Sequence, residues 1–280
     1  MKELFDNVSN SCSKLVTKKY STSFSMAVNM LSSTIREDIY NIYGFVRFAD
    51  EIVDSFHNYN KEKLLNKFEE DYYAAKFQGI SLNPILHSFQ KTVNTYNITD
   101  DMVSAFLKSM KADLYKSEYQ TIEEYKDYIY GSADVVGLMC LKVFVNGNEA
   151  KYEELKEPAM RLGSAFQKVN FLRDLKDDYE VLNRSYFPNI DLGQLDAASK
   201  QAIIKEIEDD FDFAYLNGIL KLPVEAKFGV YMAYRYYRRL LKKLKKVPSE
   251  KIMDTRIRIS DPMKINLLAR SYVKYKLNLI

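Results

Sequence analysis

Apolar residues recur at intervals of three and four positions along most of this chain, the spacing that lines one face of an α-helix. Few segments alternate apolar and polar residues as a half-buried strand would. The pattern predicts helices over residues 4–18, 33–58, 60–76, 81–95, 100–115, 121–130, 132–146, 151–179, 198–219, 223–246 and 261–276. We therefore expect an all-α protein.

Residues at the ends of these segments support the assignment. Thr121 is followed three positions later by Glu124, the pairing of a capping box, and Pro223 suits the first turn of a helix. Gly79 and the Asn-Gly-Asn segment 146–148 suit helix ends. The longest predicted loop covers 182–198, directly after a polar stripe, where loops often act as lids. No repeat or low-complexity linker divides the chain, so the simplest expectation is one domain over residues 1–280.

Two predicted helices, 33–58 and 151–179, each carry a polar stripe among large apolar residues. Within a stripe the residues lie three or four positions apart, so they share one helix face. One stripe contains Arg47, Asp50, Glu51 and Asp54, and the other contains Gln167, Asn170, Asp174 and Asp178. A single stripe is more often a solvated face, but two of them on otherwise apolar helices favour a cavity lined by both.

The carboxylates of these stripes indicate a particular chemistry. Two carboxylates one helical turn apart lie about 6 Å apart along the axis. Oxygen donors so placed suit Mg²⁺, which keeps several waters and shares phosphate oxygens. Two such pairs fit metal-assisted ionisation of a diphosphate. The sequence has few residues for other kinds of catalysis. His57 and His87 are the only histidines, and neither zinc-ligand spacing nor a glycine-rich phosphate loop occurs.

Composition narrows the partners and the compartment. The chain has 41 basic and 38 acidic residues, a formal net charge of +3, so nucleic acid is not indicated. Cys12 and Cys140 lie far apart, as free thiols in a reducing compartment would. The N-terminus lacks a secretory pattern, and no window approaches about 18 consecutive apolar residues. We expect a cytoplasmic protein, with peripheral contact to the inner membrane face left open.

Five segments together resemble the squalene and phytoene synthase family of head-to-head prenyl transferases. They are 20–24 (YSTSF), 47–54 (RFADEIVD), 130–137 (YGSADVVG), 162–174 (LGSAFQKVNFLRD) and 184–188 (RSYFP). Their order and spacing span most of the chain. The resemblance implies a single-domain, all-helical isoprenoid synthase fold with a central active-site cavity.

The same resemblance implies roles for individual residues. The implied cofactor is Mg²⁺, with Mn²⁺ as a substitute, and its ligands would be Asp50, Asp54, Asp174, Asp178 and Asn170. Tyr43 and Tyr130 would line the chamber near the reacting carbons and, with the four aspartates, would be catalytic. The residues that would contact diphosphate or the metal shell are Ser21, Ser23, Arg47, Gln167, Asn170, Arg184, Tyr186 and Arg256, with Arg258 as an alternative to Arg256.

The family reaction implied is the joining of two prenyl diphosphates through a cyclopropylcarbinyl diphosphate. The chain ends without the C-terminal membrane anchor typical of eukaryotic squalene synthases, which favours a phytoene synthase of carotenoid biosynthesis that uses geranylgeranyl diphosphate and no NADPH. One alternative is farnesyl diphosphate condensation to dehydrosqualene, presqualene diphosphate or squalene. The other is a non-catalytic scaffold of the same fold. The oligomeric state is not indicated.

Three features leave alternatives open. Segment 132–134 reads Ser-Ala-Asp where the family usually has Val-Ala-Gly, and Asp134 either adds a polar group to the chamber wall or faces outward. Tyr20 stands where some relatives carry histidine. The basic segment 234–246 either docks on an anionic membrane or forms a helix with one solvated face and one core face.

Overall fold

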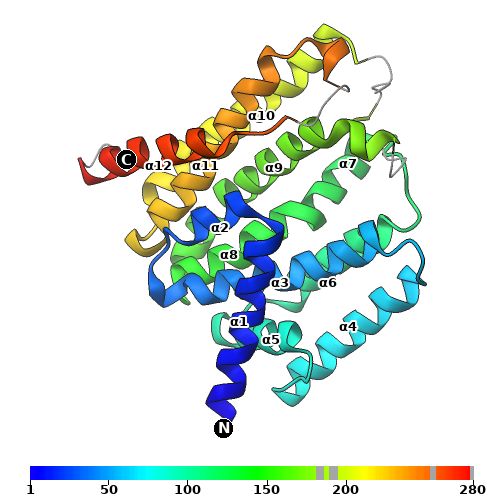
Figure 1. Cartoon of the computed structure of the whole chain (residues 1–280), viewed down its shortest axis with the longest axis vertical. Helices are drawn as coiled ribbons and strands as arrows, with labels where there is room; N and C mark the ends of the chain where they lie inside the picture. Colours follow the sequence, from blue (N-terminus) through cyan, green and yellow to red (C-terminus); the bar gives the residue numbers. More distant parts are fainter. Residues whose placement is uncertain (181–185, 189–194, 253–256, 278–280) are drawn as a thin grey trace.

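The chain folds almost entirely into helices (Figure 1). Our computed structural model describes residues 1–180, 186–188, 195–252 and 257–277, and all of their side chains except those of 177–180 and 250. No β-sheet forms within these residues. The all-α prediction is therefore confirmed.

The α-helices match the predicted segments closely. In chain order they are α1 (Lys2–Tyr20), α2 (Thr22–Val28), α3 (Ser33–Ser55), α4 (Lys61–Gln78), α5 (Pro84–Tyr96), α6 (Asp100–Ala112), α7 (Ile122–Ile129), α8 (Val135–Val145), α9 (Glu149–Glu180), α10 (Ala197–Asn217), α11 (Val224–Lys246) and α12 (Asp261–Lys276). Short 3₁₀ turns lie at η3 (Ile219–Lys221) and η4 (Ser249–Lys251), and a π-helical turn, η1 (Tyr130–Asp134), joins α7 to α8. The sequence prediction missed α2, a helix of only seven residues.

Local sequence accounts for where several helices begin and end. Thr121 and Glu124 form the capping box expected at the start of α7. Asn83 caps α5 by accepting hydrogen bonds from two backbone N–H groups, directly before Pro84. At the end of α4, Gly79 takes the left-handed conformation (φ 71°) that a side chain disfavours.

Two large hydrophobic clusters meet around the middle of the molecule. One is built on α3, α5, α6 and α8, with Phe45 fully buried and its ring stacked 3.9 Å from that of Phe89. The other is built on α9, α10 and α11, with Phe211 fully buried. In Figure 1, α4 and α5 lie at one end of the molecule and α10, α11 and α12 at the other.

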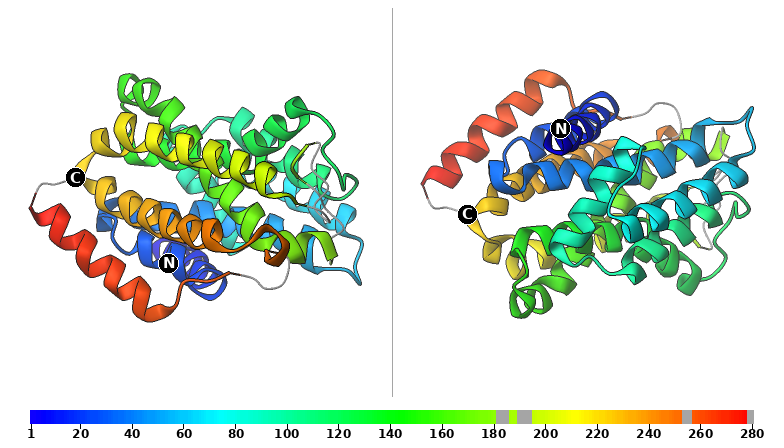
Figure 2. Two further views of the ribbon diagram at one scale, coloured as in Figure 1. Left: turned by 90° about the horizontal axis from the view of Figure 1, so that it is seen from above. Right: turned by 90° about the horizontal axis from the view of Figure 1, so that it is seen from below.

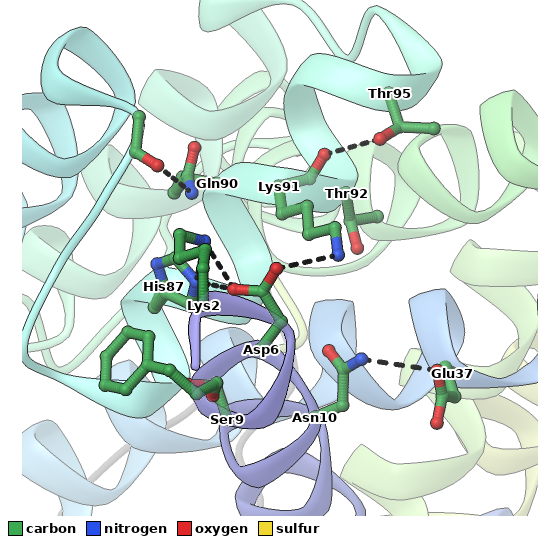
Figure 3. A network of polar contacts seen from close by, with 12 residues as sticks. Lys2, Asp6, Ser9, Asn10, Glu37, His87, Gln90, Lys91, Thr92 and Thr95 are labelled. Carbon is green, nitrogen blue, oxygen red and sulfur yellow. Dashed lines mark hydrogen bonds and ion pairs between the residues drawn. The ribbon is translucent and has the colours of Figure 1, made fainter.

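Helix α1 is fixed to α5 by a polar contact at its N-terminal end, shown in Figure 3. Asp6 accepts hydrogen bonds from Lys2 and Lys91, and its Oδ1 lies 2.7 Å from Nε2 of the buried His87. Lys2 and His87 hold the pKa of Asp6 well below its ordinary value. His87 therefore has a structural partner at some distance from either polar stripe.

The π-helical turn brings the start of α8 against α9. Gly163 of α9 approaches so closely that a Cβ atom there would lie 2.8 Å from the carbonyl oxygen of Ala133. A larger residue at position 163 would push the two helices apart. The continuous segment Ile122–Val145 is long and apolar enough to cross a membrane by length and composition, but 67% of its most apolar window is buried in this fold. Its packing against α6 and α9 accounts for that composition.

Candidate active site

An apolar chamber of about 270 Å³ lies between α2, α3, α8, α9 and α11. The end away from the polar stripes, referred to below as the deep end, is formed by Leu31, Phe144, Leu155 and Gly229. Its other end is formed by residues that lie later on α3, α9 and α11, among them Tyr43, Gln167 and Tyr237. Between Leu155 and Gln167 the lined stretch of α9 is about 18 Å long at the usual helical rise. The expected central cavity is therefore present, with room for an elongated apolar molecule.

The first polar stripe lies on α3 immediately beyond this second end. Arg47, one turn after Tyr43, donates hydrogen bonds to both Asp50 and Glu51. Its guanidinium carbon also lies 4.4 Å from the centre of the Tyr20 ring. Burial alone would lower the pKa of Arg47, but Asp50 and Glu51 outweigh it and raise the pKa. The guanidinium is thus a permanent positive charge held among carboxylates.

Tyr43 connects this stripe to the chamber. Its ring lines the cavity and stacks on Phe24 at 4.7 Å. Burial raises the pKa of Tyr43 to about 12, and the hydroxyl is hydrogen-bonded to Ser21. Ser21 is also the residue that ends α1 and caps α2, where its Oγ accepts from the Phe24 N–H at 3.3 Å. The 20–24 segment therefore positions a neutral phenol at the mouth of the chamber.

The second polar stripe lies on α9 at the same end. Arg173 donates from Nε to Asp174 Oδ1 at 2.9 Å and makes a second bond through its Nη2, so the pair is bidentate. Although burial lowers the pKa of Arg173, Asp174 raises it well above its ordinary value. One turn earlier, Asn170 Oδ1 accepts from the Tyr237 hydroxyl at 3.3 Å, and that ring stacks on Phe166 at 4.1 Å.

Tyr43 and Tyr237 show that the stripes converge. Both rings line the chamber, and they lie close enough for Tyr237 to influence the ionisation of Tyr43 electrostatically. The charge of Asp50 also affects the ionisation of Tyr43, and the charge of Asp174 affects that of Tyr237. Both stripes therefore adjoin one end of the apolar cavity through these tyrosines, although Gln167 is the only described stripe residue that lines it.

The donor types at this end suit Mg²⁺. Asp50, Asp54, Asp174 and the amide of Asn170 offer hard oxygen atoms of the kind that Mg²⁺ prefers. Among the side chains that the structure describes, no three His, Cys, Asp or Glu form a ready-made metal cluster. Asp178 lies in α9 one turn beyond Asp174, but its side chain is outside the described residues. The chemistry of the donor set fits a divalent cation, which stays a prediction.

Neither Tyr130 nor Tyr186 lines the chamber, which contradicts the position predicted for Tyr130, whereas the diphosphate contact predicted for Tyr186 stays a prediction. Tyr130 is 41% exposed and is not among the residues that line the chamber. The π-helical turn that begins at Tyr130 adds a residue to its helical turn, which takes Tyr130 out of register with the wall positions Ala133 and Gly137. Tyr186 is buried in an aromatic cluster outside the chamber lining, where its ring stacks on Phe171 at 4.0 Å.

The remaining predicted residues have varied positions. Gln167 lines the chamber. Ser23 lies in a small pocket between α2, α11 and α12, beside Tyr236 and Lys264. Arg184 and Arg256 lie outside the described residues.

Of the two positions left open for Asp134, the structure supports the chamber wall and not the outward-facing one. Its side chain is buried, and it accepts a hydrogen bond at 2.7 Å from Ser164 of α9. Burial raises the pKa of Asp134 to about 7. Behind it, buried Lys168 forms ion pairs with Asp210 and Glu206 of α10. Asp134 therefore ties the π-helical turn to α9 within the chamber wall.

The sequence prediction missed Arg173 and Tyr237 as site residues. Arg173 follows Asn170 by three positions, so helical spacing alone would have placed it beside the second stripe. Tyr237 follows Ala233 and Val230 at helical intervals, and all three line the chamber. Only the packing of α11 against α9 shows that Tyr237 meets Asn170.

Known proteins provide independent comparisons. The sequence model of squalene/phytoene synthase matches residues 17–262. Phytoene synthase 1 of Solanum lycopersicum is 25% identical over 259 residues, covering 86% of this chain and 61% of its own length. The 4,4'-diapophytoene synthase of Staphylococcus haemolyticus is 27% identical over 199 residues, covering 70% of this chain and 66% of its own length. The chain thus spans about two thirds or less of these relatives.

A solved structure agrees with the fold. The crystal structure of a dehydrosqualene synthase in complex with ligand superimposes with a TM-score of 0.84 at 21% identity, covering 97% of this chain and 98% of that one. The match of the family model to most of the sequence, together with this all-helical fold, leads to a plain conclusion. The chain belongs to the squalene/phytoene synthase family.

Proposed function

We propose that this family member joins two geranylgeranyl diphosphates head to head to form phytoene, with Mg²⁺ as cofactor. The observation that carries the proposal is an apolar chamber whose end at Tyr43 and Tyr237 adjoins the arginine–carboxylate contacts of α3 and α9. An apolar cavity suits the hydrocarbon tails, and a highly charged end suits their diphosphate groups. The phytoene synthases among the relatives also support this choice of substrate.

Binding of the diphosphates is assigned to the charged end. Asp50, Asp54, Asp174 and Asp178, with Asn170, would hold Mg²⁺, which when bound neutralises charge on the leaving diphosphate. Arg47 and Arg173 supply planar, permanently charged donors that match phosphate oxygens. In the structure these arginines bond the carboxylates. We expect them to bond the substrate when cations balance the aspartates.

The chamber is assigned to the carbon chemistry. Loss of the first diphosphate leaves an allylic cation, which the double bond of the second substrate attacks, and loss of a proton gives a cyclopropylcarbinyl diphosphate. Loss of the second diphosphate, rearrangement and loss of a second proton then give the central double bond of phytoene. The faces of Tyr43, Phe166 and Tyr237 stabilise positive charge near the charged end. The apolar walls keep water from capturing the cations.

A C30 product is the second candidate, in which two farnesyl diphosphates are joined. The similarity in fold to a dehydrosqualene synthase and the similarity in sequence to a 4,4'-diapophytoene synthase favour it. Squalene itself would require a hydride from NADPH, whereas phytoene and dehydrosqualene do not. A non-catalytic scaffold would have no need for the complete set of aspartates.

Product analysis tests these candidates. The purified chain is incubated with Mg²⁺ and either geranylgeranyl or farnesyl diphosphate, with and without NADPH, and the hydrocarbon is identified by mass spectrometry. We expect a C40 product from the C20 substrate, independent of NADPH. A C30 product alone would replace phytoene with the farnesyl reaction, and no product from either substrate would favour the scaffold.

A further inference from the structure

A second, strongly basic concavity lies on the far side of α11 from the chamber. This groove, between α11 and α12, has a volume of about 960 Å³. Its charged lining residues are Arg235, Arg238, Arg239, Lys242, Lys245, Lys246, Arg270 and Glu208. Seven cationic side chains thus face a single carboxylate, although the whole chain is nearly balanced in charge. The groove concentrates positive charge at one place on the surface.

Few of these charges are balanced within the described part of the chain. Lys245 pairs with Glu208, and Arg238 pairs with Asp212. Arg235 donates instead to the neutral hydroxyl of Tyr231. The remaining four cations form no ion pair with described residues, and they are Arg239, Lys242, Lys246 and Arg270. An anionic partner would relieve their mutual repulsion.

Helix α12, which forms the other side of the groove, presents apolar residues outward. Its inner face packs Leu268 and Tyr275 against Phe228 and Met232 of α11. The outer face has apolar residues at intervals of four, and Ile265, Val273 and the adjoining Leu277 are 66%, 55% and 63% exposed. By helical spacing, Arg270 and Lys274 lie on one side of that face and Lys276 lies within it. In Figures 1 and 2, α12 lies along the outside of the molecule.

We propose that the outer face of α12, together with the basic groove, docks the protein on a lipid bilayer that carries anionic headgroups. A helix that lies in a membrane interface buries apolar side chains and binds headgroups through lysine and arginine, and α12 exposes both kinds of residue on the outside of the molecule. The groove cations would then bind headgroups beside the inserted face. Nucleic acid would use the charges but would leave the apolar face unexplained. The inference does not depend on the proposed reaction, because its test measures binding.

The test is co-sedimentation of the full chain with phosphatidylcholine vesicles that either contain or lack phosphatidylglycerol. We expect binding only to the anionic vesicles, and weaker binding as salt is added. Each cation at an anionic surface contributes about fivefold to binding, so the double variant K242E/K246E should bind at least about 25-fold more weakly. The double variant I265S/V273S should also lose binding, because it removes the inserted apolar groups.

Matched controls separate this surface from general effects. K63E/K67E on α4 makes the same change in net charge, and L4S/L15S on α1 replaces two leucines that are 58% and 56% exposed. Both controls should bind as the unchanged chain does, and circular dichroism should show that all variants stay helical. Absence of binding to anionic vesicles, or equal losses in the controls, would overturn the proposal. If heparin displaced the protein completely and I265S/V273S bound normally, the groove would instead be a site for a soluble polyanion.

Discussion

The two faces of α11 show how one helix can serve two environments. Toward the chamber it presents Val230, Ala233 and Tyr237, whose neighbours are mostly apolar or aromatic, with Asn170 accepting from the Tyr237 hydroxyl. Toward the groove it presents Arg238, Lys242 and other cations, which face solvent and α12. On the inner face, shape and burial decide what a substitution does. On the outer face, charge and ionic strength decide what a substitution does. Substitutions on the two faces should therefore differ in the size of their effects and in how far those effects depend on ionic strength.

The largest difference between the chamber side and the groove side should appear in the rate of catalysis. Asp50→Asn or Asp174→Asn should lower the rate of product formation about a hundredfold or more, because each removes a charge that holds the cation-bound diphosphate. Asp212→Asn is the matched control, since Asp212 pairs with Arg238 at the groove and should leave the rate unchanged within about twofold. Steady-state rates at saturating substrate provide the measurement. Wild-type turnover in either site variant would remove the stripes from the mechanism.

The buried carboxyl of Asp134 should make the free energy of unfolding depend on pH. The charges in the groove should not. The pKa of Asp134 is raised to about 7, so between about pH 4 and pH 7 the folded protein keeps a proton that the unfolded chain has lost. This contribution to the free energy of unfolding is fully present below about pH 4 and is lost as pH rises to 7. Asp134→Asn keeps an acceptor for Ser164 without the charge.

The variant should therefore gain stability relative to the unchanged protein as pH rises from about 4 to about 7, by up to about 4 kcal/mol. Urea unfolding at several pH values across that window measures the difference. Asp212→Asn, whose carboxylate is 61% exposed, should show a nearly constant difference. A flat difference for Asp134→Asn would mean that the carboxyl is already charged at pH 4.

Ion pairs on the two sides should differ in their contribution to stability. Lys168→Met leaves buried Asp210 with Arg161 as its remaining cation and should lower the free energy of unfolding by about 3 kcal/mol. Lys245→Met, which removes the exposed pair with Glu208, should cost less than about 1 kcal/mol. Chemical denaturation of both variants makes the comparison. Similar losses would contradict the contrast between the interior and the groove.

The smallest predicted effect concerns the depth of the chamber. Leu31 lies at the deep end and is buried, so Leu31→Phe should shorten the space for the hydrocarbon tail. We expect the ratio of kcat/KM for farnesyl over geranylgeranyl diphosphate to rise about tenfold. Leu31→Ile, which conserves volume, should leave that ratio nearly unchanged. No change in the ratio for Leu31→Phe would place the determinant of chain length elsewhere in the wall.

Helical spacing explains why much of the site could be predicted from the sequence. Arg47 and Asp50 must share a face once α3 forms, whatever the helix packs against. The same reasoning placed Asn170 and Asp174 together. By contrast, the contact of Tyr237 with Asn170 depends on how α11 crosses α9, and the groove depends on how α12 packs on α11. Periodicity within one helix carries no information about either crossing.

Irregular backbone and short elements explain where the structure differs from the sequence prediction. The family resemblance put Tyr130 at the chamber, whereas the π-helical turn takes this residue out of register with the wall positions. Helix α2 was missed because seven residues give too short a window for its period to be recognised. The chamber wall was one of the two alternatives for Asp134, but the sequence did not show that the close approach of Gly163 brings Ser164 within hydrogen-bonding distance of it.

The π-helical turn also means that part of the wall is encoded by the number of residues and not by their identity. Deleting Ser132 would let the segment close into a regular α-helix with little net rotation of the helices on either side, because the wide turn holds one residue more than an α-helical turn. One residue deleted from the regular helix α7 would instead rotate Val136 and Gly137 by about 100° relative to the start of that helix, although every one of their atoms would be unchanged. A substitution cannot reproduce that error, and a compensating insertion one turn away can repair it.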